Sequence, residues 1–305
     1  MGLTCMDRVL ITGANGFTGH YLCRLLSEQG YDVHGLVHSG QRSAVLPHAA
    51  ATHAGDLLDG DFLRRLVSGI RPTHVVHLAA ISFVEHGNAE EIYRTNLFGT
   101  RNLLEALAHA DNRPEAVLVA SSANVYGNRV SGQLSEDSPP EPVNDYAVSK
   151  LASEYLLGLY HNRLPIICVR PFNYTGVGQS EQFLIPKIVA HARRKAPLIA
   201  LGNLDTARDF SDVRTVVAKY AKLLREPQAI GKTYNVCSGQ AYSIREVLEL
   251  VERQSGHHLH IDVDPSLVRT NEVQRLWGNP AKLASQIGME AEIALEDTLE
   301  WMLQA

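Results

Sequence analysis

The stretch Gly13-Ala14-Asn15-Gly16-Phe17-Thr18-Gly19 decides the fold of this chain. Residues 8–12 before it form a short apolar run, typical of a buried parallel strand. Residues 21–29 after it have the apolar spacing of a helix that stops at Gly30. Glycines at such a turn let the backbone approach a pyrophosphate, which the helix N-terminus attracts through its amides and partial positive charge. The stretch therefore predicts a dinucleotide-binding turn, with a plain structural turn as the alternative.

Strands and helices alternate along the first 170 residues. We expect strands at 33–37, 74–78, 116–120 and 165–170, and helices at 62–68, 92–109 and 146–160. This order predicts an α/β fold, a Rossmann-type doubly wound parallel sheet with helices on both faces. The alternation weakens after about residue 175, where helices are expected at 183–194, 213–224 and 244–254. Residues 1–172 are thus expected to bind NAD(P), and residues 173–305 to form mainly a smaller α/β substrate-binding region, partly interleaved with the first.

Composition narrows the class of protein. The 305 residues are 45% hydrophobic and 20% charged, the balance of an ordinary globular protein. A net charge of -5 disfavours a broad basic surface for nucleic acid. No apolar run approaches the ~20 residues that cross a bilayer, and residues 1–8 lack the apolar core of a signal peptide. We expect a cytoplasmic protein with neither nucleic acid nor a membrane as a partner.

Cysteines and clustered histidines give no metal signal. Cys5, Cys23, Cys168 and Cys237 form no CxxC pair, and reduced thiols are expected rather than disulfides or a metal site. The run His257-His258-Leu259-His260 follows a glycine at a turn, which predicts an exposed loop rather than metal ligands.

The residues after the second expected strand bear on cofactor choice. NAD enzymes usually place an acidic residue there to bind the ribose hydroxyls, whereas this chain has Val37-His38-Ser39-Gly40-Gln41-Arg42. Ser39 and Arg42 suit a 2′-phosphate, so NADP(H) is favoured and NAD(H) remains an option; alternatively, His38 and Arg42 are solvated loop residues. Asp56, followed by Leu57, is placed either to accept a hydrogen bond from the adenine amino group or to cap the next helix.

A tyrosine and a lysine stand four residues apart at the start of an expected helix. Tyr146 and Lys150 therefore lie on one helix face. A neighbouring ammonium favours the phenolate and lowers the pKa of tyrosine from its reference value of ~10. Ser121-Ser122 lies at the end of the preceding strand, at the edge where parallel sheets form their active sites. This combination predicts proton-transfer chemistry, with a surface Tyr-Lys pair as the alternative.

With these residues the sequence resembles the extended short-chain dehydrogenase/reductase family, whose members act on sugar nucleotides. Its motifs are the glycine loop, His77-Leu78-Ala79-Ala80, Asn96-Leu97-Phe98-Gly99-Thr100, Ser122 before Ala123-Asn124-Val125-Tyr126-Gly127, Tyr146 with Lys150, and Arg170-Pro171-Phe172-Asn173. The resemblance implies a triad of Ser122, Tyr146 and Lys150, and a homodimer formed by the helices at 92–109 and 146–160. The expected cofactor-binding residues are Gly13, Asn15, Gly16, Phe17, Thr18, Gly19, His38, Ser39, Arg42, Asp56, Leu57, Leu78, Ala79, Ala80, Tyr146, Lys150 and Phe172.

The reaction is narrowed by the residues after Ser122. Sugar-nucleotide dehydratases of this family carry acidic residues there, but Ala123 and Asn124 cannot act as acid or base, which disfavours dehydration. The C-terminal half resembles that of GDP-4-keto-6-deoxy-mannose reductases, although Val177 and Thr270 stand where proline is usual. The substrate-binding residues expected are Ser82, Asn173, Lys187, Arg208, Arg269 and Glu272.

Alternatives stay open for several of these residues and for the reaction. Arg208 and Arg269 suit a diphosphate or a surface salt bridge, and Glu272 suits ribose hydroxyls or a solvated loop. The expected activity is NAD(P)H-dependent reduction of the C4 ketone of a nucleotide-linked 4-keto-6-deoxy sugar, foremost GDP-4-keto-6-deoxy-D-mannose. The alternatives are an NAD-dependent sugar-nucleotide 4-epimerase and a non-catalytic dinucleotide sensor.

Overall fold

The computed structural model describes residues 6–41, 46–82, 87–127, 132–264, 274–289 and 291–305. Their contacts divide the chain into two compact units. Unit 1 comprises Met1–Gly127, Pro140–Arg170 and Val217–Tyr234, and unit 2 comprises Asn128–Pro139, Pro171–Val216 and Asn235–Ala305. Each unit is described by itself.

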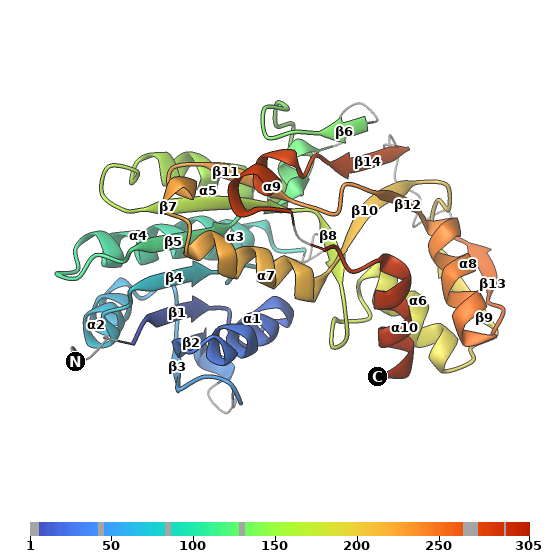
Figure 1. Ribbon diagram of the computed structural model, residues 1–305, viewed down its shortest axis with the longest axis horizontal. Coiled ribbons are helices and arrows are strands. Elements are labelled where there is room, and N and C mark those ends of the chain that lie inside the picture. The colour runs from blue at the N-terminus through green and yellow to red at the C-terminus, as the bar shows by residue number, and fades with distance from the viewer. Residues whose placement is uncertain (1–5, 42–45, 83–86, 128–131, 265–273, 290) are drawn as a thin grey trace. The chain divides into compact units, whose positions relative to one another are not determined.

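Unit 1 is organised around a seven-stranded sheet (Figure 1). Its strand order is β11-β7-β5-β4-β1-β2-β3, and each pairing from β7 to β3 is parallel. The strands are β1 (Arg8–Thr12), β2 (Asp32–His38), β3 (Ala51–Gly55), β4 (His74–His77), β5 (Ala116–Ala120), β7 (Ile166–Pro171) and β11 (Thr233–Val236). The order reverses between β1 and β4, and ligands of such sheets bind outside the carboxyl ends of the strands at this switch point. The predicted doubly wound Rossmann-type sheet is confirmed.

Helices cover the sheet, and the buried apolar stripe of α2 shows how such a helix is held. In α2 (Gly60–Ile70), Leu63, Leu66, Val67 and Ile70 recur at helical spacing and are buried. They share a core with strand residues and with α4 (Thr100–Ala108) and α5 (Asp145–Gly158). Figure 1 shows α1 (Phe17–Glu28) and α7 (Val213–Leu224) over the other face.

The single helix expected at 92–109 is wrong in detail. The structure has α3 (Ala89–Tyr93), a π-helical turn η2 (Arg94–Gly99) and then α4. The carbonyl of Asn96 accepts hydrogen bonds from the hydroxyls of Thr100 at 2.5 Å and Ser153 at 3.1 Å. These two side-chain donors bond a backbone carbonyl where the helix widens into the π turn. Such π turns often occur at functional sites.

Unit 2 has its own sheets and core. Its larger sheet has the order β12-β10-β14-β6, with β8 also paired to β10, and β13 pairs with β9 in a separate ribbon. Three helices pack into the core of this unit: α6 (Leu184–Arg193), α8 (Ile244–Ser255) and α10 (Leu295–Gln304). The remaining elements are β6 (Gly132–Leu134), β8 (Asn173–Thr175), β9 (Leu198–Leu201), β10 (Ala207–Asp212), β12 (Ala241–Ser243), β13 (His260–Val263), β14 (Arg275–Gly278) and α9 (Ala281–Ile287).

The cysteines that the structure describes are free thiols, and the histidine run at 257–260 leads into a strand. Cys23, Cys168 and Cys237 are buried free thiols, and Cys5 lies outside the described residues. His260 begins a strand rather than closing an exposed loop, and Nε2 of His257 lies 2.7 Å from the carbonyl of Ala196. Within the described ranges, every helix is too short or too polar to cross a bilayer.

Candidate active site

The glycine loop forms a cradle at the end of β1. Gly13 has φ +69°, and a Cβ there would lie 2.8 Å from the amide nitrogen of Ala79, just past β4. A Cβ on Gly19 would lie 2.6 Å from the carbonyl of Ala14. Gly16 is the N-cap of α1 and offers no side chain to cap it. The backbone here fits a pyrophosphate, because glycines permit the close approach and the helix N-terminus attracts the charge.

The two positions after β2 and β3 differ in what the structure describes. His38 is exposed, and its Nδ1 accepts from the amide of Gly40 at 3.2 Å within the 3-10 turn η1 (Ser39–Gln41). Arg42 lies outside the described residues. Asp56 does not cap α2: its Oδ1 accepts from the amide of Leu58 at 2.9 Å.

The cap of α2 is Asp59 instead. Its Oδ1 accepts from the amide of Phe62 at 2.9 Å. A cap at Asp56 would require the helix to begin at Leu57, but α2 begins at Gly60. The capping alternative for Asp56 is therefore wrong. Leu57 between them is buried, and its carbonyl accepts from Asn102 of α4 at 3.0 Å.

Tyr146 and Lys150 lie in the first two turns of α5, which Asn144 caps. Each is only 7% exposed, so the alternative of a surface pair is wrong. The Lys150 ammonium donates to the carbonyl of Ala120 at 2.7 Å, at the last residue of β5. Burial lowers the pKa of Lys150 to about 8, an effect that the carboxylate of Glu154 partly opposes. A lysine in this state loses its proton at a lower pH than an exposed lysine does.

Ser122 follows the end of β5 by two residues. It is 7% exposed and is the N-cap of the 3-10 turn η3 (Ala123–Tyr126). Its hydroxyl oxygen accepts from the amide of Asn124 at 3.1 Å. Because Lys150 is bonded to Ala120, the structure brings the lysine to the strand end that carries Ser122. Ala123 and Asn124 supply no carboxylate in this turn.

A buried polar chain supports the switch point, and the residue patterns alone did not reveal its connections. Nδ1 of His77 lies 2.7 Å from the hydroxyl of Thr12, and Nε2 lies 2.9 Å from that of Thr100. Burial lowers the pKa of His77 to about 3, so the ring is neutral. The Thr12 hydroxyl also accepts from the amide of Ala79 at 3.2 Å. The end of β1 is thereby joined to β4 and α4.

Asn96 joins the π turn to α5. Its Oδ1 accepts from the amide of Ile81 at 2.8 Å, and its Nδ2 donates to the carbonyl of Ile81 at 3.1 Å and to the Ser149 hydroxyl at 3.0 Å. Ser149 in turn donates to the carbonyl of Tyr146 at 2.7 Å. The segment after β4 is therefore fastened to the helix that carries the tyrosine. Ser82, the next residue of that segment, is exposed.

In unit 2 the candidate substrate residues occupy several elements. Arg208 is half-buried in β10, and its Nη1 donates to the carbonyl of Ala207 at 2.9 Å. The amide of Asn173, in β8, donates to the carbonyl of Asp209 at 3.3 Å. Lys187 of α6 donates to the carbonyl of Ala200 at 2.7 Å. The buried Phe172 precedes Asn173, while Arg269, Thr270 and Glu272 lie outside the described residues.

Asp209 is a residue that the sequence patterns missed. It is fully buried, and its carboxylate accepts from the amide and hydroxyl of Ser238 at 2.9 and 2.7 Å and from the amides of Gly239 and Gly278 at 2.9 and 3.2 Å. Burial raises its pKa, and these donors oppose the rise. The position beside Arg208 in an Arg-Asp-Phe segment was the available signal. Asp209 fixes the strand that presents Arg208.

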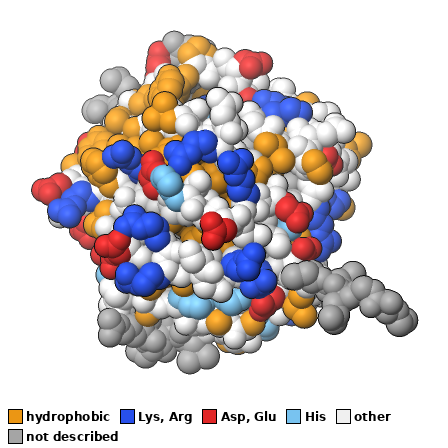
Figure 2. All heavy atoms as spheres, turned by 90° about the vertical axis from the view of Figure 1, so that its left-hand side faces the viewer, with side chains coloured by type: hydrophobic (Ala, Val, Ile, Leu, Met, Phe, Trp, Pro, Cys, Tyr) orange, Lys and Arg blue, Asp and Glu red, His pale blue; other side chains and the backbone are white. Residues whose placement is uncertain are grey.

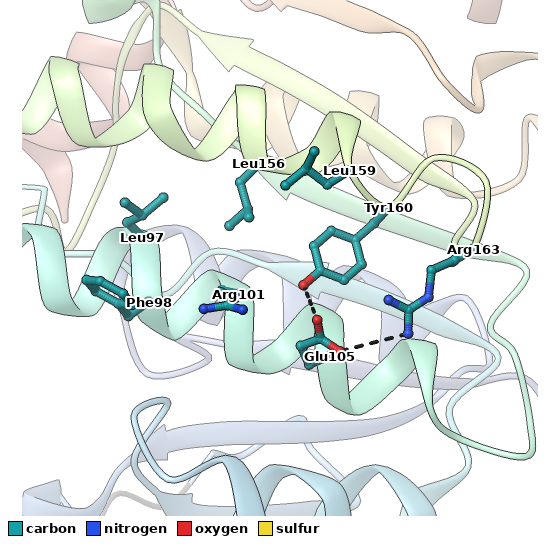
Figure 3. Close-up of a pocket in the computed structure, with 8 residues that line it drawn as sticks. All are labelled: Leu97, Phe98, Arg101, Glu105, Leu156, Leu159, Tyr160 and Arg163. Atoms are coloured by element: carbon teal, nitrogen blue, oxygen red, sulfur yellow. Dashed lines mark hydrogen bonds and ion pairs between the residues drawn. The ribbon is translucent and has the colours of Figure 1, made fainter.

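A separate groove lies on the surface of unit 1 along α4 and α5. It encloses about 380 Å³ and is lined by Leu97, Phe98, Arg101, Glu105, Leu156, Leu159, Tyr160 and Arg163 (Figure 3). The Tyr160 hydroxyl donates to Glu105 at 2.6 Å, and Arg163 approaches the same carboxylate at 3.8 Å. The candidate triad is not among these lining residues.

Comparison with known proteins assigns the family. The model for GDP-mannose 4,6 dehydratase matches residues 10–302. The chain belongs to the GDP-mannose 4,6 dehydratase family. This family lies within the extended short-chain dehydrogenases/reductases, as the motifs predicted.

Among curated members, the chain is 35% identical to GDP-6-deoxy-D-mannose reductase of Pseudomonas aeruginosa over 309 residues, covering 97% of this chain and 96% of that one. It is 33% identical to GDP-6-deoxy-D-talose 4-dehydrogenase of Aggregatibacter actinomycetemcomitans over 285 residues, covering 92% and 91%. These two relatives are named as a reductase and a dehydrogenase, so the proteins similar to this chain are not all named as dehydratases.

Solved structures agree with this family assignment. A candidate epimerase from Burkholderia cenocepacia superposes with a TM-score of 0.93 at 48% identity, covering 98% of this chain and 97% of that chain. RMD from Pseudomonas aeruginosa, complexed with NADPH, superposes with a TM-score of 0.83 at 33% identity over the same shares. The RMD structure is thus an example of this fold in complex with NADPH.

Proposed function

We propose that this protein is an NADPH-dependent reductase of the C4 ketone of GDP-4-keto-6-deoxy-D-mannose. Its family is one of NAD(P)-dependent enzymes that act on nucleotide sugars. The observation that carries the proposal is the buried pair of Tyr146 and Lys150 on α5, attached to the strand end that carries Ser122. The two residues directly after Ser122 are Ala123 and Asn124, and neither is acidic, which favours reduction over dehydration.

Each residue of the set has one task in the proposal. Tyr146 donates a proton to the alkoxide that forms at C4, and Ser122 donates a hydrogen bond to the same oxygen and orients it. The Lys150 ammonium, on the same helix face, favours the phenolate that Tyr146 becomes when it gives up its proton. NADPH, when bound, supplies the hydride. The glycine cradle at Gly13 and Gly19 would hold its pyrophosphate.

The choice of NADPH rests on the turn after β2. His38-Ser39-Gly40-Gln41 carries no carboxylate for a ribose diol, and NADPH is the cofactor in the RMD complex. Ser39 is half-buried in the turn, and Arg42 follows it in sequence. We infer that this segment accepts the 2′-phosphate.

A second candidate is supported by particular relatives. The Burkholderia cenocepacia structure is of a candidate epimerase, and an enzyme of that class would keep NAD bound and need no net reductant. The 6-deoxy-D-talose relative supports the opposite C4 configuration in a reduced product. A dinucleotide sensor without activity has no use for a buried Tyr-Lys pair, which disfavours that class.

A substrate panel separates these candidates. The purified enzyme is incubated with GDP-, UDP- and dTDP-linked 4-keto-6-deoxy sugars and NADPH, while NADPH absorbance and the NMR spectrum of the product are followed. We expect the GDP-linked sugar to consume one NADPH per product and to give one C4 epimer. Interconversion of reduced sugars without NADPH consumption would replace the proposal by epimerisation. An NADH efficiency about ten times that of NADPH, or ~1.4 kcal/mol, would contradict the cofactor choice.

A further inference from the structure

A buried ion pair links α5 to β7 one helical turn beyond Lys150. Nε of Arg170 donates to Oε1 of Glu154 at 2.9 Å, and Nη2 donates to Oε2 at 2.6 Å. The two side chains are only 10% and 11% exposed. Burying two charges costs hydration that their attraction only partly recovers, so a buried pair is weak evidence for stability. Its connections to neighbouring elements indicate a role in fixing geometry.

The same ion pair holds both ends of the turn that contains Ser122. On one side, the hydroxyl of Ser121 donates to Oε1 of Glu154. On the other, the hydroxyl of Tyr126 accepts from Nη1 of Arg170 at 2.9 Å, and the guanidinium carbon lies 4.9 Å from the centre of the Tyr126 ring. Ser122 is therefore anchored from both directions by one pair of charges.

Glu154 also sets how α5 sits on the end of β5. Lys150 and Glu154 are four residues apart and lie on one face of the helix. Lys150 bonds the carbonyl of Ala120, and Glu154 bonds the hydroxyl of Ser121, the next residue of the chain. Two attachments one turn apart fix the helix along and around its axis. The position of Tyr146, one turn before Lys150, follows from them.

We propose that Glu154, paired with Arg170, is the positioning residue that holds Ser122, Tyr146 and Lys150 in their reactive arrangement. The inference rests on the function proposed above and deepens it. Glu154 acts through the groups that it holds, since its carboxylate is bonded to Arg170 and Ser121.

The surroundings of Lys150 give this role a signature beyond stability. The carboxylate of Glu154, on the same helix, raises the pKa of Lys150 against the effect of burial, and His77 on β4 is neutral. Burial also raises the pKa of the Cys168 thiol, which is therefore uncharged at neutral pH. Removing the charge of Glu154 should thus lower the pKa of Lys150 further, and the lysine would lose its proton at a lower pH.

The first test is Glu154→Gln, which keeps the shape of the side chain and removes its charge. Small misplacements of reacting groups cost up to ~100-fold in rate, so we expect kcat to fall about ten- to hundredfold with KM nearly unchanged. Without substrate, side-chain lysine NMR should show a lower pKa for Lys150, assigned by its absence in Lys150→Met. Unchanged kcat together with an unchanged lysine pKa would overturn the positioning role.

A matched pair of tyrosine variants separates positioning from stability. Tyr126→Phe removes the bond to Arg170. Tyr31→Phe removes an equivalent bond, since Nε of Arg225 donates to the Tyr31 hydroxyl at 3.0 Å and the guanidinium carbon lies 5.0 Å from the centre of that ring. Both tyrosines are buried in unit 1. We expect similar losses of thermal stability, with kcat reduced by about threefold or more only in Tyr126→Phe. Equal kcat in both variants would contradict the inference.

Failure of the proposed function has a different outcome. An enzyme that reduces none of the keto sugars would refute the substrate assignment, and the lysine NMR would still decide whether Glu154 controls Lys150. An active wild-type enzyme whose Glu154→Gln variant keeps both kcat and the lysine pKa would refute the positioning role alone.

Discussion

At the scale of single residues, the chemistry depends on one phenolic proton. Tyr146→Phe removes the proton donor and keeps the buried ring, so the fold should survive. Loss of a general acid typically costs about 100- to 10,000-fold in rate, and we expect kcat to fall within that range. The control is Tyr93→Phe, which removes a hydroxyl bonded to Asp145 at 2.9 Å in the same turn of α5. Turnover of Tyr146→Phe within about threefold of the control, less than 1 kcal/mol, would refute the assignment.

Among the described residues, Arg208 is the one whose substitution tests the nucleotide-sugar assignment most directly, because it is the candidate for binding the diphosphate. A charge-assisted contact to phosphate contributes about 1.5–3 kcal/mol, so Arg208→Ala should weaken binding of free GDP roughly ten- to 150-fold. NADPH affinity should stay unchanged. Arg245→Ala is the control, because Arg245 is exposed and pairs with Asp205 at 3.0 Å. Calorimetry decides, and equal GDP affinity in both variants would mean that Arg208 does not hold the diphosphate.

At the scale of elements, the junction of β1 and α1 tolerates no side chain at Gly19. A Cβ there would crowd the backbone carbonyls of Gly13 and Ala14. Gly19→Ala should therefore lose about 1–3 kcal/mol of unfolding free energy and most NADPH affinity. Gly69→Ala on α2 meets nothing within 4 Å and should gain about 0.5–1 kcal/mol, because glycine is the poorer helix former. Denaturant unfolding of both variants checks the sign, and a stabilised Gly19→Ala would contradict the close approach.

At the scale of the whole molecule, apolar side chains remain on the outer surface of α5. Tyr155 and Leu159 are 72% and 75% exposed, and Leu159 is one of the residues that line the groove of Figure 3. Figure 2 shows hydrophobic side chains gathered at one side of the face that it views. From the resemblance to the extended family, we predict that a second copy covers this surface in a two-fold dimer.

Light scattering tests the dimer. The wild type should have a mass about twice 33.5 kDa at micromolar concentration, and Tyr155→Glu combined with Leu159→Glu should reduce it to that of one chain. Met289→Glu replaces another exposed apolar residue, 92% exposed in unit 2, and should leave the mass unchanged. A wild-type mass of a single chain would refute the dimer.

Local patterns predicted several elements with their bounds, and they placed Tyr146 and Lys150 on one helix. The strand at 116–120 and the helix at 213–224 have the bounds that their apolar spacing predicted. The glycine loop lies between strand and helix, and Tyr146 and Lys150 share a helix face because four residues make about one turn. Such features depend on neighbours in sequence, which is why the chain revealed them before its tertiary structure was known.

Tertiary structure alone decided the connections between these features. Glu154 meets Ser121 and Arg170, and Arg170 meets Tyr126, because the order of β5 and β7 brings their ends beneath α5. Thr12 meets His77 across 65 positions of sequence because β1 and β4 are adjacent at the switch point. These contacts depend on strand order and burial. Neither strand order nor burial can be predicted from the periodicity or spacing within one segment. The contacts that position the site therefore became known only with the tertiary structure.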